Sequence, residues 1–247
     1  MAWLFVATVA PLLNYTYAGS NTVTLHPSDD AYIRANQASF NYGSGDTIYI
    51  SKTTSGYENY GLIRFNLSSI PSGSVIISAK LRLYAESVSY AVETLYIYRV
   101  TESWNEDSVT WDTKPSWDST PSANITDITS TGWYEADVTE DIQAFVDGVY
   151  LNYGWILIPE GGDYDTVSVA SKENSDSSIR PQLIVEYVEP VTVTETVYIT
   201  TTTENVTITE TTTITNIITE TVTTNTCLLY TSPSPRDLST SRMPSSA

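Results

Sequence analysis

The sequence predicts an all-β protein: a jelly-roll β-sandwich with one short helix, followed by an extended threonine-rich stalk. Three observations predict this fold class. Short segments alternate apolar and polar residues with a period of two, as strands with one buried face do. Turn residues separate these segments. The composition favours strands, with 18 Tyr and 6 Trp among 247 residues. A closed barrel is the alternative architecture.

The charge and the reactive side chains exclude several classes of function. The formal net charge is −18, and such a surface repels nucleic-acid backbones, so no nucleic-acid partner is expected. The chain holds one histidine, His26, and one cysteine, Cys227. A Cys/His zinc site and a disulfide framework need more such residues and are therefore excluded. A Cys–His dyad is not expected either, because Cys227 lies in a C-terminal tail that is interpreted below as an artefact.

Residues 1–18 have the pattern of a secretory signal peptide. An apolar run from Ala2 to Leu13 is followed by the small residues Ala18, Gly19 and Ser20. The run is shorter than the roughly 20 residues that span a bilayer. We expect cleavage near Ala18 and an extracellular or cell-surface location, with a buried first strand as the alternative.

A β-sandwich domain is predicted over residues 20–188, because eight short segments there alternate in polarity. In one of them, Leu81 and Leu83 are expected to face inward, and Lys80, Arg82 and Tyr84 outward. The eight segments are Thr22–His26, Thr47–Ser51, Leu62–Leu67, Lys80–Tyr84, Thr94–Tyr98, Gly154–Ile158, Thr166–Ala170 and Gln182–Tyr187.

One helix is predicted near residue 140, and we expect it to close one end of the sandwich. Asp137 and Glu140 have the spacing of a capping box, with Asp137 as the N-cap and Glu140 reaching back to it. Gly148 provides a C-terminal stop. The residues expected on the buried face are Ile142, Phe145 and Val146.

Residues 191–226 are predicted to form a stalk, because 18 of these 36 residues are Thr and few are large and apolar. Their interpretation is a spacer that holds the domain away from a surface. A strand donated to a neighbouring subunit, giving self-association, and a plain flexible linker are the alternatives. Dense threonine also invites O-glycosylation.

Residues 227–247 match the translation of a sequencing adapter in one reading frame, from Cys227 to Ala247. Our hypothesis is that this tail is an artefact and that the gene continues beyond codon 226. A membrane is then a partner only through an anchor in that lost part.

An ordered set of short motifs resembles the DNRLRE domain, which is related to the disaggregatase repeat and to an alginate-binding family of carbohydrate-binding modules. The resemblance implies an extracellular, non-catalytic jelly-roll module, often fused within larger surface or polysaccharide-handling proteins. The motifs are Leu25–Asp30, Asn41–Gly43, Arg64–Pro71, Ile77–Tyr84, Val100–Trp104, Val109–Trp111, Pro115, Asp137–Thr139, Gly148, Asn152–Gly154, Ala170–Glu173 and Arg180–Leu183.

A structural calcium ion is the one cofactor that the sequence suggests. Calcium takes six to eight oxygen ligands, and an acidic extracellular sandwich supplies them from its turns. The candidate ligands are Asp29, Asp30, Asn41 and Glu173. The alternative is a solvated acidic loop in which Asp30 caps a turn.

Sugar binding is expected on exposed aromatic rings, and the candidates are Trp117, Trp133 and Tyr134. Trp104 and Trp111 are instead expected to pack an irregular loop against the core. Neutral glycans, or anionic ones bridged by calcium, fit the acidic chain better than polyanions do. A local basic face made by Lys52, Arg64, Lys80 and Arg82, which could bind an anionic glycan, remains an alternative.

No catalytic motif stands out, so no enzymatic activity is expected. Glycoside hydrolysis needs two carboxylates roughly 5–10 Å apart, a spacing that acids such as Glu135 and Asp137 satisfy by chance in an acidic chain.

The sequence as a whole predicts a surface-displayed module for adhesion or carbohydrate binding, with a polysaccharide or cell-envelope glycan as its partner. Two alternatives remain: an accessory module of a truncated polysaccharide-degrading enzyme, and a structural subunit that assembles by strand donation. N-glycosylation sequons begin at Asn66, Asn124 and Asn205.

Overall fold

The computed structural model describes residues 19–52, 56–160 and 165–190, together with the strand backbones of 12–13, 192–200 and 207–215. The adapter-like tail, most of the leader and Asn205 lie outside the described residues. Within the described part of the chain, no helix is both long and apolar enough to cross a membrane.

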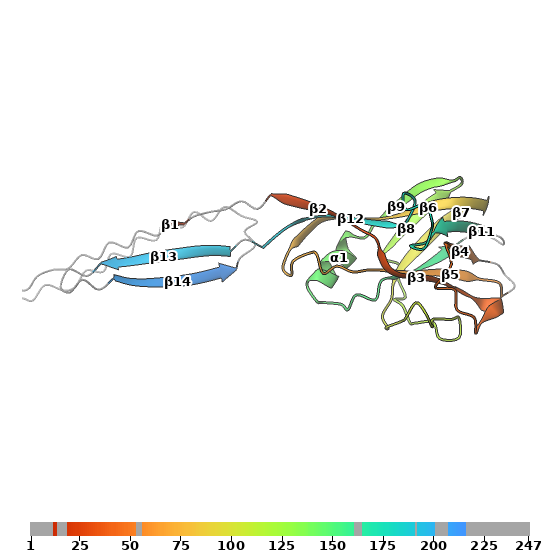
Figure 1. Cartoon of the computed structure of the whole chain (residues 1–247), viewed down its shortest axis with the longest axis horizontal. Coiled ribbons are helices and arrows are strands. Elements are labelled where there is room, and N and C mark those ends of the chain that lie inside the picture. Colours follow the sequence, from red (N-terminus) through yellow and green to blue (C-terminus); the bar gives the residue numbers. More distant parts are fainter. Residues whose placement is uncertain are drawn as a thin grey trace, which may run out of the picture. The chain divides into compact units, whose positions relative to one another are not determined.

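The described residues form β-strands, one α-helix and one short 3-10 helix (Figure 1). In chain order they are β1 (Leu12–Leu13), β2 (Ser20–Leu25), β3 (Pro27–Arg34), η1 (Ala35–Gln37), β4 (Thr47–Lys52), β5 (Asn59–Phe65), β6 (Val75–Tyr90), β7 (Val92–Arg99), β8 (Ala123–Ile128), β9 (Gly132–Asp137), α1 (Thr139–Val146), β10 (Trp155–Glu160), β11 (Asp165–Ala170), β12 (Gln182–Val188), β13 (Thr192–Thr200) and β14 (Thr207–Thr215).

One antiparallel sheet curls into a sandwich. Its strand order is β2-β12-β6-β11-β4-β5-β10-β7-β8, with β3 added on β5 and β9 added on β6. The inward side chains of β6, β11 and β12 meet those of β5, β7 and β10 in one core. This arrangement confirms the predicted all-β, jelly-roll type of fold.

All eight segments predicted as strands are strands, but one of them is longer than predicted and three further strands of the sandwich were not predicted. The predicted strand 80–84 is the middle of β6, which runs for 16 residues. Leu81 and Leu83 are buried, and Lys80, Arg82 and Tyr84 are partly exposed, as the alternation predicts. The strands β3, β8 and β9 were not predicted.

Trp155 lies at the centre of the core. Its ring contacts Phe65 and Phe145, with ring centroids 6.3 and 5.9 Å away. The ring is fully buried, and its indole N–H donates to the carboxylate of Asp141 over 2.7 Å. A buried indole N–H without an acceptor would be destabilising, so this bond ties α1 to β10.

The helix α1 closes one end of the sandwich, below β2 and β12 in Figure 1. Ile142 and Phe145 are buried in the core, as predicted, and Val146 packs beside them. The side chain of Gln143 accepts a hydrogen bond from the backbone N–H of Ile76 and donates one to the carbonyl of Ser74. These bonds fix the helix to the start of β6.

The ends of α1 differ in part from the prediction. The N-cap is Val138, without a side-chain cap, and the Asp137 carboxylate accepts from the N–H and hydroxyl of Thr139. The capping box with Asp137 as N-cap is therefore wrong, because the helix starts one residue later. The predicted stop is confirmed, since Gly148 has φ of +70°. The N–H groups of Gly148 and Val149 donate to the carbonyls of Phe145 and Ala144, as in a Schellman motif.

A second hydrophobic cluster lies on the outer side of β3, β5, β7 and β10, under the loop 101–117. Trp104 is buried there and donates its indole N–H to the carbonyl of Tyr153 over 2.8 Å. Trp111 packs on Tyr60, with ring centroids 5.0 Å apart. The prediction that Trp104 and Trp111 pack a loop is confirmed.

The threonine-rich segment contains two described strands. β13 pairs antiparallel with β14 over their full lengths, and β1 pairs with β13 through Leu12 and Leu13. In these described stretches the backbone is therefore extended, and the two strands form an antiparallel pair.

Gly154 lies at a position where the surrounding backbone leaves no space for a side chain. It has φ of +73°, and an added Cβ would lie 2.1 Å from the Ile63 carbonyl oxygen and 2.8 Å from the Arg64 Cα. Gly154→Ala should therefore destabilise the fold by at least about 2 kcal/mol. A thermal melt should show a Tm lower by roughly 4–8 °C. Gly45→Ala is the control, because its Cβ would make only an ordinary contact at 3.5 Å. Equal melting temperatures for the two variants would contradict the assignment.

Candidate functional site

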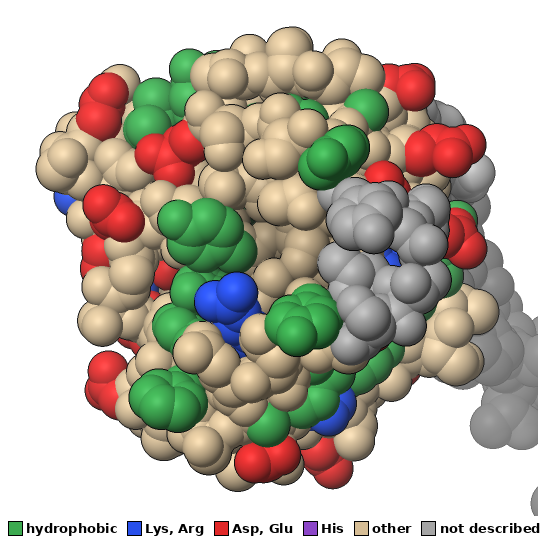
Figure 2. Space-filling view, turned by 90° about the vertical axis from the view of Figure 1, so that its right-hand side faces the viewer, with side chains coloured by type: hydrophobic (Ala, Val, Ile, Leu, Met, Phe, Trp, Pro, Cys, Tyr) green, Lys and Arg blue, Asp and Glu red, His purple; other side chains and the backbone are tan. Residues whose placement is uncertain are grey.

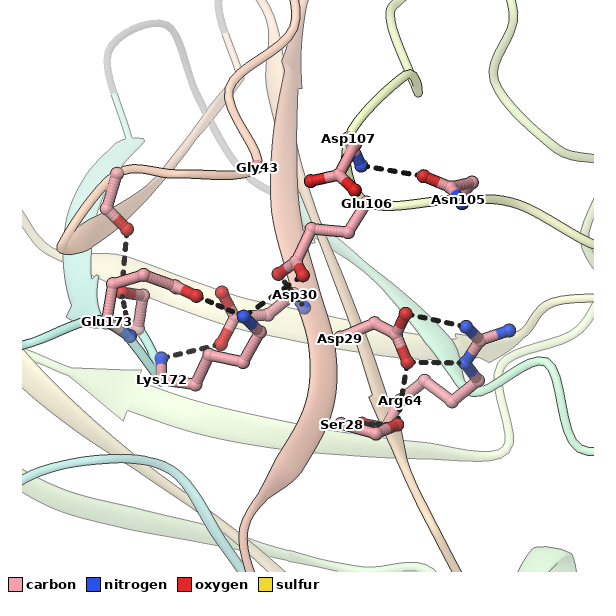
Figure 3. Close-up of polar contacts among 12 residues, drawn as sticks. Ser28, Asp29, Asp30, Gly43, Arg64, Asn105, Glu106, Asp107, Lys172 and Glu173 are labelled. Atoms are coloured by element: carbon pink, nitrogen blue, oxygen red, sulfur yellow. Dashed lines mark hydrogen bonds and ion pairs between the residues drawn. The ribbon is translucent and has the colours of Figure 1, made fainter.

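Three carboxylates from distant segments meet beside β3. Asp30 lies in β3, Glu106 in the loop 101–117, and Glu173 in the turn after β11. One carboxylate oxygen of each lies within 4.8 Å of the others. Figure 3 shows all three on the same side of the β3 ribbon, with Lys172 between them. This acidic cluster joins two loops to one strand.

Burial makes the acidic cluster electrostatically unusual. Asp30 is 1% exposed, and burial, together with the charges of Glu173 and Glu106, raises the pKa of Asp30 to about 8. Burial also raises the pKa of Glu106. Asp30 is therefore largely protonated at neutral pH unless a cation compensates it.

Lys172 supplies the positive charge at the centre of the acidic cluster. Its ammonium bonds Glu173 and lies 3.0 Å from Glu106 Oε2. Its backbone N–H donates to Asp30 over 2.7 Å, and the Asp30 N–H donates to Glu106 over 2.9 Å. Burial opposes the charged form of Lys172, but the bonds to Glu173 and Glu106 raise its pKa overall.

Two of the four predicted metal ligands belong to the acidic cluster. Asp29 points to the other side of β3 (Figure 3) and pairs with Arg64 over 2.7 Å. Although burial acts to raise it, hydrogen bonds from Arg64 and Ser28 lower the pKa of Asp29. Asn41 donates to the carbonyls of Glu106 and Val109. It therefore positions the loop that carries Glu106.

Glu106 was missed by the sequence analysis. It lies 76 residues from Asp30 in an irregular loop, and only the fold brings the two together. The sequence feature that comes closest to indicating Glu106 is the Val100–Trp104 motif, because the buried Trp104 anchors the loop in which Glu106 lies.

A second group of side chains projects outward from β6 and β9, and we call it the Trp133 face. It consists of Lys80, Arg82, Tyr84, Trp133, Glu135 and Asp137. The strand register sets Tyr84 opposite Trp133, Arg82 opposite Glu135 and Lys80 opposite Asp137. Side chains directly opposite each other on one side of a sheet interact closely.

Contacts hold Trp133 in one orientation. The Arg82 guanidinium carbon lies 4.6 Å from the centroid of the Trp133 ring, and Tyr84 approaches the ring edge-on at 5.3 Å. Arg82 also donates to Gln182 over 3.1 Å. Trp133 is partly exposed, so a held aromatic ring is presented to solvent among hydrogen-bonding groups.

The two other predicted sugar ligands lie elsewhere. Tyr134 follows Trp133 on β9 and points inward, so it packs beside the core, with its hydroxyl bonded to the backbone of Thr129 and Ser130. Trp117 lies on the opposite side of the sandwich, edge-on to Tyr60 at 6.4 Å. The three predicted residues therefore do not form one site.

The four cations of the suggested basic face each have an acidic neighbour. Lys80 bonds Asp137 over 2.7 Å, and Arg82 lies 3.3 Å from Glu135. Arg64 pairs with Asp29, and Lys52 is opposite Asp165. In the view of Figure 2, basic side chains occur singly and acidic ones lie along the edge. The charge of each of these four cations is therefore offset locally by an acidic side chain.

A hollow of about 400 Å³ lies beside the first turn of α1 and holds several acids. Arg99 lies 2.5 Å from Asp118 and 3.8 Å from Asp141. Asp141 is also the acceptor of the Trp155 indole. Asp118 and Asp141 therefore serve packing, because through Arg99 they join the helix to the loop 118–122.

Two of the three sequon asparagines are described, and both are exposed. Asn66 accepts a hydrogen bond from the N–H of Ser68 over 2.9 Å. Asn124 of β8 lies opposite Tyr96 of β7, on the side of the sandwich away from the Trp133 face.

Comparison with protein families identifies the domain. The profile of carbohydrate-binding module family 96 matches residues 21–187. The chain belongs to this family. The matched range covers the strands of the sandwich from β2 to β12, including the acidic cluster and the Trp133 face. A search of curated proteins found no match.

Asp29 and Asp30 should respond to pH in opposite directions. The pKa of Asp30 is raised when the protein folds, so its contribution to stability is lost as the pH rises from about 4 to about 8. Asp30→Asn should remove this loss, so its Tm relative to the parent should increase between pH 5 and pH 9, measured with a chelator present. A difference that does not change with pH would contradict the raised pKa of Asp30.

Asp29→Asn is the matched control. The pKa of Asp29 is lowered by folding, so its contribution is present above pH 4 and is lost as the pH falls further. This variant should melt below the parent at pH 7, and the deficit should shrink at pH 3.

Proposed function

We propose that this member of carbohydrate-binding module family 96 is a non-catalytic module that binds a polysaccharide through the Trp133 face. The protein is displayed outside the cell, where it serves adhesion. The observation that carries the proposal is the held and partly exposed Trp133 ring, with Arg82 over it and Tyr84 beside it.

The chemistry of the Trp133 face suits a sugar. An indole ring stacks on the apolar side of a pyranose, and the charged groups around it accept or donate hydrogen bonds to hydroxyls. Because Arg82 lies over one side of the ring, the sugar stacks on the opposite side. Gln182 and Glu135 flank Arg82 on neighbouring strands and extend the polar rim.

The acids on this face support a binding role. A general acid at neutral pH needs a raised pKa. The hydrogen bonds from Lys80 and Thr139 instead lower the pKa of Asp137 to about 2. Asp137 and its neighbour Glu135 are each paired with a cation.

Calcium is proposed as a structural ion at the acidic cluster. Asp30, Glu106 and Glu173 offer carboxylate oxygens, and Glu173 Oε2 is buried without a hydrogen-bond partner among the described residues. The Lys172 ammonium lies where it bonds two of these groups, so a bound ion displaces it. The ion would fix the loop 101–117 to β3 and has no chemical step to perform.

Display outside the cell is supported by the family, the leader pattern and the exposed sequons. We propose N-glycans at Asn66 and Asn124, both of which are exposed. Because Asn124 is on the opposite side of the sandwich, a glycan there leaves the Trp133 face accessible. The threonine-rich segment acts as the spacer.

Trp133→Ala should lower polysaccharide affinity by at least about tenfold, because the loss of a stacking ring removes on the order of 1.5 kcal/mol or more. Affinity electrophoresis in gels containing neutral polysaccharides measures it. Trp117→Ala is the matched control, because it removes a tryptophan on the opposite side of the sandwich and should leave polysaccharide affinity unchanged. If only Trp117→Ala lost binding, the binding site would lie on the side of Trp117, and the proposal would be contradicted.

Calcium should raise the melting temperature of the full chain. An ion present at about 100 times its Kd stabilises by about 2.7 kcal/mol. Differential scanning fluorimetry with CaCl₂ against EDTA should therefore show an increase of several degrees. Glu106→Gln should reduce it, and Asp107→Asn, an exposed neighbour, should not. No shift in the parent, or an equal shift in Glu106→Gln, would overturn the calcium proposal.

A further inference from the structure

The charge pairs on the Trp133 face are asymmetric in their exposure. The Asp137 side chain is 58% exposed and its partner Lys80 is 41% exposed. The Glu135 side chain is 59% exposed and its partner Arg82 only 27%. A ligand that approaches from solvent therefore meets the two carboxylates before the two cations.

The cations are also committed to other contacts. The guanidinium of Arg82 is shared among Glu135, the Trp133 ring and Gln182. The Lys80 ammonium bonds Asp137 directly across the strand pair. A carboxylate of an acidic polysaccharide would therefore have to compete with Glu135 and Asp137 for these cations, at close range to both acids.

We propose that Glu135 and Asp137 are specificity-determining residues that make the Trp133 face select neutral polysaccharides and reject polyuronates. This inference rests on the proposed function, because it assigns the ligand class of the same face. The two carboxylates act in three ways. They neutralise Arg82 and Lys80, and they repel an anionic chain while accepting hydrogen bonds from sugar hydroxyls.

Screening does not remove this selection. The Debye length at physiological ionic strength is about 8 Å, which is longer than the contact distance between a bound uronate and the side chains of the face. The formal net charge of −18 adds a repulsion of the same sign over the whole chain.

The test is the double variant Glu135→Gln/Asp137→Asn in the full chain. The amide introduced at position 137 would still accept the hydrogen bond of Thr139, so the start of α1 is kept, and a thermal melt checks folding. Affinity electrophoresis uses gels with polygalacturonate, with hydroxyethylcellulose and with galactomannan, each against a gel without polysaccharide. We expect polygalacturonate affinity to rise by about twofold to thirtyfold, from two freed cation contacts, and to fall again with added salt.

Two controls separate the local effect from total charge. Glu93→Gln/Asp112→Asn removes two exposed carboxylates elsewhere and should give no gain. Adding Lys80→Gln and Arg82→Gln to the first double variant should abolish the gain. The inference is overturned if the double variant gains nothing, if the control gains equally, if the gain survives loss of both cations, or if the parent binds polygalacturonate as tightly as neutral chains.

The two proposals fail in different ways. If the parent binds no neutral polysaccharide, the proposed function fails. The gain of polygalacturonate binding in the double variant would still show that Glu135 and Asp137 block the cations of this face.

Discussion

The cross-strand register between β6 and β9 is the constraint on which the outer face and the core both depend. Leu81 and Leu83 enter the core only if Lys80, Arg82 and Tyr84 point outward. A slip of one residue would exchange these sets, burying charge and exposing leucine. The burial of the leucines therefore sets Arg82 beside Trp133 and Glu135. The geometry of the candidate binding face is thus a consequence of hydrophobic packing.

The acidic cluster has a similar relation to the rest of the fold. Through its contacts with Asp30 and Lys172, Glu106 attaches the loop 101–117 to β3 and to the turn after β11. The same loop covers the second hydrophobic cluster, into which it inserts Trp104. Burying Asp30 disfavours its charged form, as its raised pKa shows. The unfavourable burial is tolerated because the same contacts hold the loop in place. The acidic cluster therefore holds the loop, whereas the Trp133 face is the surface proposed for binding.

Sequence patterns predicted the strands that have one buried side, because only those alternate. β3 was missed since Asp30, Ala31, Tyr32 and Ile33 are all buried, which removes the alternation. With β3 unrecognised, Asp29 and Asp30 could not be assigned to opposite sides, so both were grouped as ligands. β9 was missed as well, and so Trp133 and Tyr134 were treated alike although they point in opposite directions. Glu106 could not be predicted as a member of the acidic cluster, because only tertiary contacts bring it there and they leave no local sequence pattern.

The central claim is that a sugar chain stacks on Trp133. The most direct measurement is a ¹H–¹⁵N spectrum of the full chain labelled at its six tryptophans, titrated with a neutral oligosaccharide. The account predicts that the indole resonance of Trp133 shifts, while those of Trp104 and Trp155, bonded to Tyr153 and Asp141, stay in place. A shift of Trp117 with Trp133 unchanged, or no shift in any indole, would contradict it.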